Sequence, residues 1–264
     1  MQKKDMARYK LTIEYDGTRY SGWQLQKGAK SVQGTLIDAC KEIFPGEKIE
    51  LYGAGRTDQG VHALAQVAHL DVNRNIKPQQ LKNQLNDRLP HDVVVTHVHP
   101  AAPSFHARYD AVHRSYLYQI SKRPSAFGKK MVWWVKDPLD IGKMKQVASL
   151  FIGMKDFRNF AEKSDEDKST LVEISNIEIT GAGDLILIRV SGSHFLWKQV
   201  RRMVGVIVEA GRGKLTVHEV ESFFKRPSEL VAKLTAPPSG LYLEKVCYAG
   251  DPLPEGVAPV LRVE

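Results

Sequence analysis

The sequence predicts an α+β fold, in which strands and helices alternate along the chain. Short runs of apolar residues at every second position indicate strands with one buried face. Longer stretches with apolar residues three and four apart indicate amphipathic helices. In the first hundred residues these patterns follow the order β-α-β-β-α-β. That order is the ferredoxin-like, or split βαβ, unit, a sheet whose helices lie on one face.

The first strand is predicted over residues 9–16, and Ser31 is expected to cap a helix that ends before Pro45. A short strand at residues 49–51 then leads into a loop rich in glycine, and another strand follows at residues 66–72. Pro78 opens a second helix, closed by Pro90, and residues 93–98 form the returning strand.

The second half begins after a break at residues 99–103 and again alternates strands with helices. Its first strand, residues 113–121, places Tyr116 and Tyr118 on a common face. A basic loop is expected at residues 122–130 and a mobile surface segment of mixed charge at residues 156–168. The remaining predicted elements are a helix at 141–151, strands at 172–180 and 185–190 joined by a hairpin turn, a helix at 195–210, a short helix with a capping box from Thr216, and a last strand after residue 241.

These elements suggest three parts. Residues 1–103 form the first ferredoxin-like half and residues 104–250 the second, followed by an extended tail at residues 251–264. The two halves have no visible sequence similarity to each other, so the second is expected to repeat the first only distantly.

The predicted helix at residues 195–210 contains two adjacent arginines. On a helical wheel of about 100° per residue, Trp197 joins the apolar side, Arg202 faces solvent and Arg201 lies at the margin. A marginal arginine either extends to solvent or contacts an anionic partner, because an unpaired buried charge is costly. The pattern alone leaves both possibilities open for Arg201.

Composition indicates a globular protein with a polyanionic partner. The chain has 264 residues, 42% of them hydrophobic, which is ample for a packed core. Its net charge of +8 favours a partner such as nucleic acid, although charge alone does not distinguish RNA from DNA or a membrane. The two cysteines, Cys40 and Cys247, suggest neither a disulfide framework nor a thiolate metal site. No stretch is apolar enough to cross a membrane, so we expect a cytoplasmic protein.

Residues 51–63, Leu-Tyr-Gly-Ala-Gly-Arg-Thr-Asp-Gln-Gly-Val-His-Ala, stand out from the rest of the chain. Three glycines allow close approach to the backbone, while Arg56 and Asp58 lie two residues apart. The run has neither the third glycine of a dinucleotide fingerprint nor the lysine and hydroxyl residue of a phosphate loop. A tight turn with solvated side chains and a loop that presents Asp58 to a ligand both fit this composition.

The segment Gly55-Arg56-Thr57-Asp58-x-Gly60-Val61-His62-Ala63 resembles the signature of the TruA family of tRNA pseudouridine synthases. Further similarity lies in Arg114-x-Tyr116-x-Tyr118, in residues 195–205 around Arg201, and in the Gly-Leu-Tyr-Leu run at residues 240–243, so the resemblance covers nearly the whole chain. Gln59 replaces the alanine of many members, and this change leaves the arginine, aspartate and glycines in place.

This resemblance implies a function and a site. It implies two ferredoxin-like halves joined into one mainly antiparallel curved sheet, with helices on one face and a central catalytic cleft. Asp58 would be the catalytic residue, Arg201 its ionic partner, Tyr116 the residue against which uracil stacks, and Arg56 a residue that enters the RNA helix or contacts a phosphate. The implied reaction is the isomerisation of uridine at positions 38, 39 and 40 of the tRNA anticodon stem-loop, by a homodimer without a cofactor. Other tRNA positions are the alternative.

Two rival interpretations are disfavoured by the residues. Histidines such as His62, His97 and His99 lack the cysteine or carboxylate cluster that would complete a zinc site, so we expect no metal. A non-catalytic RNA-binding module on a ferredoxin-like sheet would be expected to carry the aromatic RNP1 pattern of an RNA-recognition motif, and no such string occurs here. A carboxylate presented beside an arginine is also of little use for merely holding a polyanion.

Overall fold

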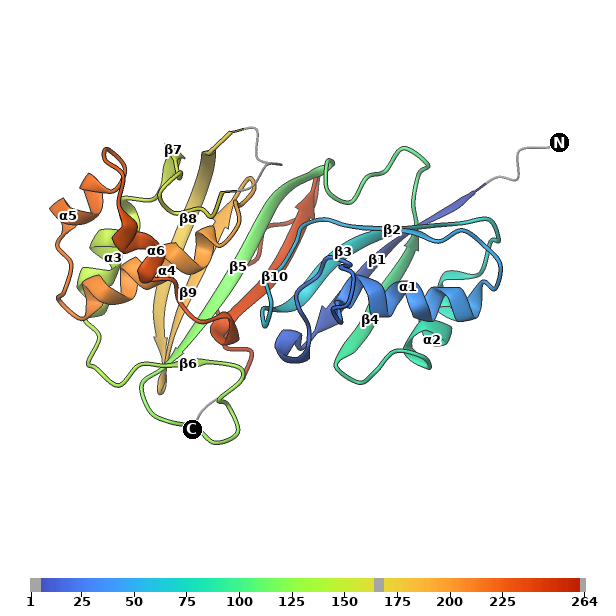
Figure 1. Cartoon of the computed structure of the whole chain (residues 1–264), viewed down its shortest axis with the longest axis horizontal. Helices are drawn as coiled ribbons and strands as arrows, with labels where there is room; N and C mark the ends of the chain where they lie inside the picture. Colours follow the sequence, from blue (N-terminus) through green and yellow to red (C-terminus); the bar gives the residue numbers. More distant parts are fainter. Residues whose placement is uncertain (1–5, 164–168, 262–264) are drawn as a thin grey trace. The chain divides into compact units, whose positions relative to one another are not determined.

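The structure, a computed structural model, describes residues 6–163 and 169–261 (Figure 1). Six α-helices and ten strands, the latter assigned to one mainly antiparallel sheet, make up this part of the chain. The predicted α+β class is therefore confirmed. Within the same residues, no helix is both long and apolar enough to cross a membrane.

The chain divides into two compact units. The first contains the residues up to Val112 together with Leu243–Pro252, and the second contains His113–Tyr242 and the residues from Leu253 onward. The C-terminal part of the last strand, β10 (Leu241–Tyr248), thus belongs to the first unit, although it lies far along the sequence.

The first unit has the predicted β-α-β-β-α-β order. Its elements are β1 (Ala7–Tyr15), the 3₁₀ turn η1 (Gly17–Arg19), α1 (Val32–Ile43), β2 (Glu50–Gly53), β3 (His62–Val72), α2 (Pro78–Asn86) and β4 (Val93–Pro100). β1 lies between β4 and β3, and β2 pairs with β3, all antiparallel. This β4-β1-β3-β2 order is that of the split βαβ unit. Ser31 caps α1 and Pro78 begins α2, as predicted.

The sheet of the first unit has one face buried under its helices. Along β1, Tyr9, Leu11 and Ile13 are buried while the residues between them are less so. The hydroxyl of Tyr9 donates to Asn75 Oδ1 (2.8 Å) and accepts from the backbone N–H of Ile76 (2.8 Å), just before α2. The alternation read from the sequence therefore reports a true inner and outer face.

The second unit also alternates strands with helices. Its elements are β5 (Ala111–Ser121), β6 (Trp133–Trp134), α3 (Ile141–Ser149), β7 (Gly153–Asp156), β8 (Leu171–Ala182), β9 (Leu185–Gly192), α4 (Gln199–Gly211), α5 (Val217–Ser222), α6 (Glu229–Lys233) and the 3₁₀ turn η2 (Pro238–Gly240). The strand order is β5-β9-β8-β7, with β6 parallel to β5. The hairpin between β8 and β9 and the capping box of Thr216 and Glu219 are confirmed.

Helix α4 differs from its prediction. It begins at Gln199, after Lys198 adopts a left-handed conformation with φ of 63°. Arg202, expected in solvent, is 6% exposed and donates hydrogen bonds to the Ala161 carbonyl and to Glu162. Trp197, assigned to the apolar side, is 48% exposed. The prediction was wrong because neighbouring segments cover α4 on most of its circumference, so burial does not follow a single apolar stripe.

The segment at residues 156–168 also differs. Phe157 and Phe160 are fully buried and pack with Phe151 and Phe224 in an aromatic cluster, with ring centroids 5.1–6.3 Å apart. The part of this segment at residues 164–168 lies outside the described residues. The expected surface segment is therefore, over its first residues, part of the core of the second unit.

Candidate active site

The loop between β2 and β3 presents Arg56 and Asp58. Its first residues are tied to β3, because the N–H of Ala54 donates to the Val67 carbonyl (2.7 Å) and the Gln66 side-chain amide donates to the Gly55 carbonyl (3.0 Å). The loop therefore leaves the sheet in a fixed direction.

Thr57, directly before Asp58, is the best-anchored residue of the loop. It is 6% exposed, and its hydroxyl shares a hydrogen bond with the hydroxyl of Tyr15 (2.7 Å). Its carbonyl accepts from the N–H of Trp23 (3.1 Å). Gly22 has a φ of 99°, and a Cβ there would lie 2.5 Å from the Thr57 carbonyl oxygen. Only glycine fits this contact, so the backbone before Asp58 is held from two sides.

Asp58 itself is half-buried, and its carbonyl accepts from the N–H of Val61 (3.1 Å). Arg56 is exposed, and its Nε donates to Gln24 Oε1 (3.1 Å). The arginine and the carboxylate thus belong to one loop, with the carboxylate at its turn. The backbone of the loop is anchored on both sides of Asp58.

The indole of Trp23 supports the start of the loop. A Cβ on Gly53 would lie 2.5 Å from this ring, so the close approach of β2 to Trp23 requires glycine. At the other end, His62 is 1% exposed and its Nδ1 accepts from the N–H of Gly17 (3.1 Å). His62 therefore has a structural role in closing the loop.

Tyr116 and Tyr118 lie two residues apart on β5 and differ in burial. Tyr116 is half-buried, with its ring edge-on to Phe195 at a centroid distance of 5.1 Å. Tyr118 is fully buried and its hydroxyl donates to the Pro237 carbonyl (2.8 Å). Tyr118 is thus a core residue, whereas Tyr116 keeps part of its surface accessible.

Arg201 lies on α4 in the same unit as these tyrosines. Its Nε donates to the Ala236 carbonyl (2.8 Å), and the Ala236 N–H donates to the Arg201 carbonyl (3.0 Å). Burial raises the pKa of Tyr118 well above its usual value, and the positive charge of Arg201 acts in the opposite direction. Arg201 is therefore close enough to influence this tyrosine, and a backbone carbonyl orients its guanidinium.

The four predicted site residues thus fall in two groups. Arg56 and Asp58 share a loop of the first unit, while Tyr116 and Arg201 come from a strand and a helix of the second. Sequence reasoning overlooked the residues that support them: Thr57, Tyr15, Gln24 and Phe195. Thr57 could have been found, because it directly precedes Asp58 in the sequence. Its contact with Tyr15 joins residues 42 positions apart, so no local sequence pattern indicates it.

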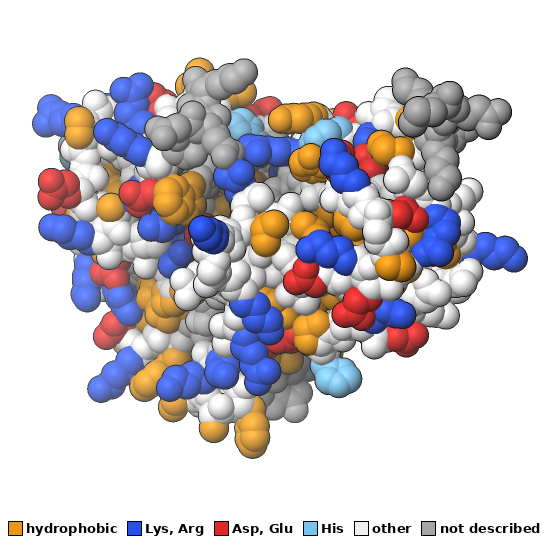
Figure 2. All heavy atoms as spheres, turned by 45° about the vertical axis from the view of Figure 1, so that its right-hand side comes forward, with side chains coloured by type: hydrophobic (Ala, Val, Ile, Leu, Met, Phe, Trp, Pro, Cys, Tyr) orange, Lys and Arg blue, Asp and Glu red, His pale blue; other side chains and the backbone are white. Residues whose placement is uncertain are grey.

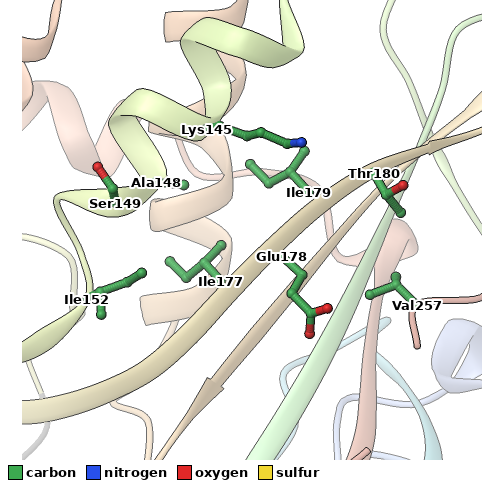
Figure 3. A pocket seen from close by; sticks show the side chains of 9 residues that line it. All are labelled: Lys145, Ala148, Ser149, Ile152, Ile177, Glu178, Ile179, Thr180 and Val257. Carbon is green, nitrogen blue, oxygen red and sulfur yellow. The ribbon is translucent and has the colours of Figure 1, made fainter. Parts of the chain in front are cut away.

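A shallow pocket of about 510 Å³ lies elsewhere, within the second unit (Figure 3). It contains none of the four predicted site residues. It is lined by Lys145, Ala148, Ser149 and Ile152 from α3 and its end, by Ile177, Glu178, Ile179 and Thr180 of β8, and by Val257 of the C-terminal tail. Across the described ranges, no three histidine, cysteine, aspartate or glutamate side chains gather as a potential metal site.

Comparison with known proteins identifies the family. The family model described as tRNA pseudouridine synthase matches residues 11–110 and 147–249. tRNA pseudouridine synthase A of Agrobacterium fabrum is 38% identical, covering 98% of this chain and 97% of that protein. The enzymes of the same name from Rhodopseudomonas palustris and Thermoanaerobacter sp. are 42% and 40% identical, each covering 92% of this chain and 100% of their own length. With the Arg56–Asp58 loop in place, this chain belongs to the tRNA pseudouridine synthase A family.

Proposed function

We propose that this protein converts uridine to pseudouridine at positions 38, 39 and 40 in the anticodon stem-loop of tRNA. Membership of the family makes the chain a tRNA pseudouridine synthase, which is an isomerase. The observation that carries the proposal is the loop that holds Asp58, because its backbone is anchored on both sides of a half-buried carboxylate. Such anchoring suits a group that must meet one atom of a bound nucleotide.

The reaction breaks the bond between C1′ and N1, turns the uracil while it is held, and joins C1′ to C5. It is redox-neutral, so no electron carrier is required. A carboxylate can divide this process into easier covalent steps. Asp58 would attack C1′ of the sugar, attack C6 of uracil, or remove the 2′ proton to give a glycal. All three routes place the Asp58 carboxylate against the target nucleotide.

Tyr116 is the proposed partner of the uracil ring. Its ring is supported edge-on by Phe195 while part of its surface stays accessible, which leaves room for a base to stack. Its hydroxyl would serve the last step, in which the proton on C5 leaves after the new carbon–carbon bond has formed.

Arg201 and Arg56 are assigned supporting roles. Arg201, oriented by the Ala236 carbonyl, would pair with Asp58 and keep it ionised. Arg56, exposed beside Asp58, would occupy the space left when the target nucleotide leaves its stack, or contact a neighbouring phosphate. We therefore call Asp58 the proposed catalytic residue and Tyr116, Arg56 and Arg201 the proposed substrate-binding residues.

The charge of the protein fits an RNA substrate. Its net charge is +8, and lysine and arginine side chains are spread across the face drawn in Figure 2. We further propose that the protein acts as a homodimer in the cytoplasm, because a tRNA is large enough to contact two subunits. The division of the chain into ferredoxin-like halves at residues 1–103 and 104–250 and an extended tail at residues 251–264 stays a prediction.

Mapping pseudouridine in tRNA tests the proposal. Cells that lack the protein should lose pseudouridine at positions 38, 39 and 40 and regain it when the wild-type gene, but not an Asp58→Asn variant, is restored. Loss at other tRNA positions would support the alternative substrate site. Unchanged pseudouridine throughout the tRNA pool would contradict the proposed activity.

A further inference from the structure

The face of the first unit's sheet opposite its helices carries a row of polar and aromatic side chains. The register of β4, β1, β3 and β2 aligns His99, Lys10, His69 and Tyr52 across the sheet. Side chains aligned in this way on one face of a sheet are neighbours. This row lies on the face that α1 and α2 leave uncovered.

Residues 103–110 lie across this face and are held there by hydrogen bonds. Arg8, which forms a salt bridge with Asp71 (2.6 Å), also donates to the carbonyls of Pro103 and Phe105. The N–H of Ala107 donates to His69 Nδ1 (3.1 Å), and the hydroxyl of Tyr248 donates to the Ala107 carbonyl (2.8 Å). Groups from β1, β3 and β10 thus hold the backbone of this segment.

Residues 103–110 add the rings of His106 and Tyr109 to the row on the sheet. Tyr52 stacks on His69, with centroids 5.2 Å apart and planes at 24°. His106 meets His69 edge-on at 4.7 Å, and Tyr109 covers His106 at 4.2 Å with planes at 31°. We call Tyr52, His69, His106 and Tyr109 the aromatic stack. Its interior is closed, since His69 is 2% exposed, whereas Tyr52 is 48% and Tyr109 is 77% exposed.

The two histidines of the aromatic stack are neutral supports. His69 Nδ1 accepts from Ala107, and His106 Nδ1 accepts from the N–H groups of Arg108 (3.1 Å) and Tyr109 (3.3 Å). A ring nitrogen that accepts a hydrogen bond carries no proton. Burial also lowers the pKa of both imidazoles. The Tyr109 ring is thereby held in place by its own backbone as well as by His106, although its outer surface is open.

We propose that the exposed rings of Tyr109 and Tyr52 stack against unpaired nucleobases of the RNA substrate, away from the target uridine. This inference rests on the proposed function. A flat, fixed ring with one open surface suits a base, which offers a π face whatever its sequence. Arg108 is exposed beside Tyr109, and Lys10 lies in the same row as His69, so positive charge accompanies the stack.

A pair of substitutions at Tyr109 tests the proposal. Tyr109→Phe keeps the ring, whereas Tyr109→Leu keeps an apolar side chain without a π face. Base stacking on an aromatic residue contributes enough that its loss lowers affinity by about fivefold to a hundredfold. We expect this loss for Tyr109→Leu with full-length tRNA in fluorescence anisotropy, and affinity within about twofold of wild type for Tyr109→Phe. Trp134→Leu, which removes an exposed aromatic residue outside the aromatic stack, is the control.

Two further measurements identify the contact. The logarithmic salt slope of binding should stay unchanged in Tyr109→Leu, because stacking releases no counterions. A fully paired RNA duplex should bind wild type and Tyr109→Leu equally. Equal tRNA affinity for Tyr109→Leu, Tyr109→Phe and wild type would overturn the proposal. A sedimentation coefficient of RNA-free Tyr109→Leu that differs from that of the wild type would also overturn it, because it would indicate that Tyr109 lies in a protein interface. An assay of pseudouridine formation by the wild type tests the proposed function separately from the stacking site. If the wild type is active and Tyr109→Leu binds tRNA as tightly as the wild type, only the stacking site is contradicted.

Discussion

The hydroxyls of Tyr15 and Thr57 lie 2.7 Å apart in a buried hydrogen bond that joins β1 to the residue before Asp58. Tyr15→Phe leaves the Thr57 hydroxyl without this partner. We expect the free energy of unfolding to fall by about 1–3 kcal/mol, the cost of an unsatisfied buried polar group. Turnover should fall as well, because the backbone that positions Asp58 becomes less constrained. Urea denaturation and single-turnover kinetics of Tyr15→Phe, Thr57→Val and the double variant measure both effects. Fully additive losses would show that the two hydroxyls act independently.

Asp58→Asn preserves the shape of the side chain and removes its charge and nucleophilicity. We expect turnover to fall by about 10⁴-fold or more, with tRNA binding largely retained, as for the loss of a covalent participant. Single-turnover pseudouridine formation and filter binding measure the two quantities. Activity within about tenfold of wild type would remove Asp58 from the catalytic role.

Arg201 and Arg202 are neighbours with different expected phenotypes. Arg201→Met should impair the chemical step, because its guanidinium is proposed to pair with Asp58. Arg202→Met should instead destabilise the fold, since Arg202 is buried and bonded to Ala161 and Glu162. Hydrogen bonds to charged groups contribute about 1.5–3 kcal/mol each, which sets the scale of the expected loss. Saturating kcat and thermal unfolding of both variants separate the effects, and an inactive but fully stable Arg202→Met would reverse this assignment.

The loop at residues 122–130 is the predicted phosphate contact. Lys129 and Lys130 are both exposed. Each phosphate that they neutralise adds roughly 0.7–0.9 to the magnitude of the log–log salt slope of tRNA binding. The Lys129→Ala/Lys130→Ala protein should therefore show a slope smaller by about one to two. An unchanged slope in a salt titration would place the phosphate contacts elsewhere.

Stability should depend on pH through His69. Burial, together with the positive charge of Arg8, lowers the pKa of His69 from 6.5 to about 4. Between pH 4 and pH 6.5, His69 therefore binds a proton in the unfolded chain but not in the folded chain. The contribution of neutral His69 to the stability of the fold is complete above pH 6.5 and is lost as the pH falls toward 4.

His69→Asn keeps a side-chain acceptor for the Ala107 N–H without titrating. Thermal unfolding measured from pH 7.5 down to about 4.5, across the range in which histidine titrates, should show a smaller decrease for this variant than for wild type. An equal decrease in both proteins would assign the pH dependence to other groups.

The sequence predicted strands well and helix burial less well, for physical reasons. Along β1, alternation follows directly from one covered and one uncovered sheet face, so Tyr9 and Leu11 were placed correctly. A helical wheel assumes one solvent-facing side, and α4 has no such side near Arg202, where the chain around Ala161 and Glu162 covers it. Phe157 and Phe160 were assigned to the surface because the residues around them in the sequence carry mixed charge.

The candidate site shows the same limit. Asp58, Arg56, Tyr116 and Arg201 were predicted from motifs, which carry residue type and spacing. Their supports come from residues distant in sequence: Tyr15 for Thr57, Phe195 for Tyr116 and Ala236 for Arg201. Such contacts depend on the folded topology, which a local pattern does not contain.

The return of β10 to the first unit has a consequence for synthesis of the chain. Residues 243–252 belong with the unit that begins at the N-terminus, and Tyr248 bonds to Ala107 and lies under Lys10. A nascent chain that has emerged only as far as Val112 therefore lacks a strand of its first unit. Because domains generally fold as units, the first unit of this protein can close only after residues 243–252 have left the ribosome.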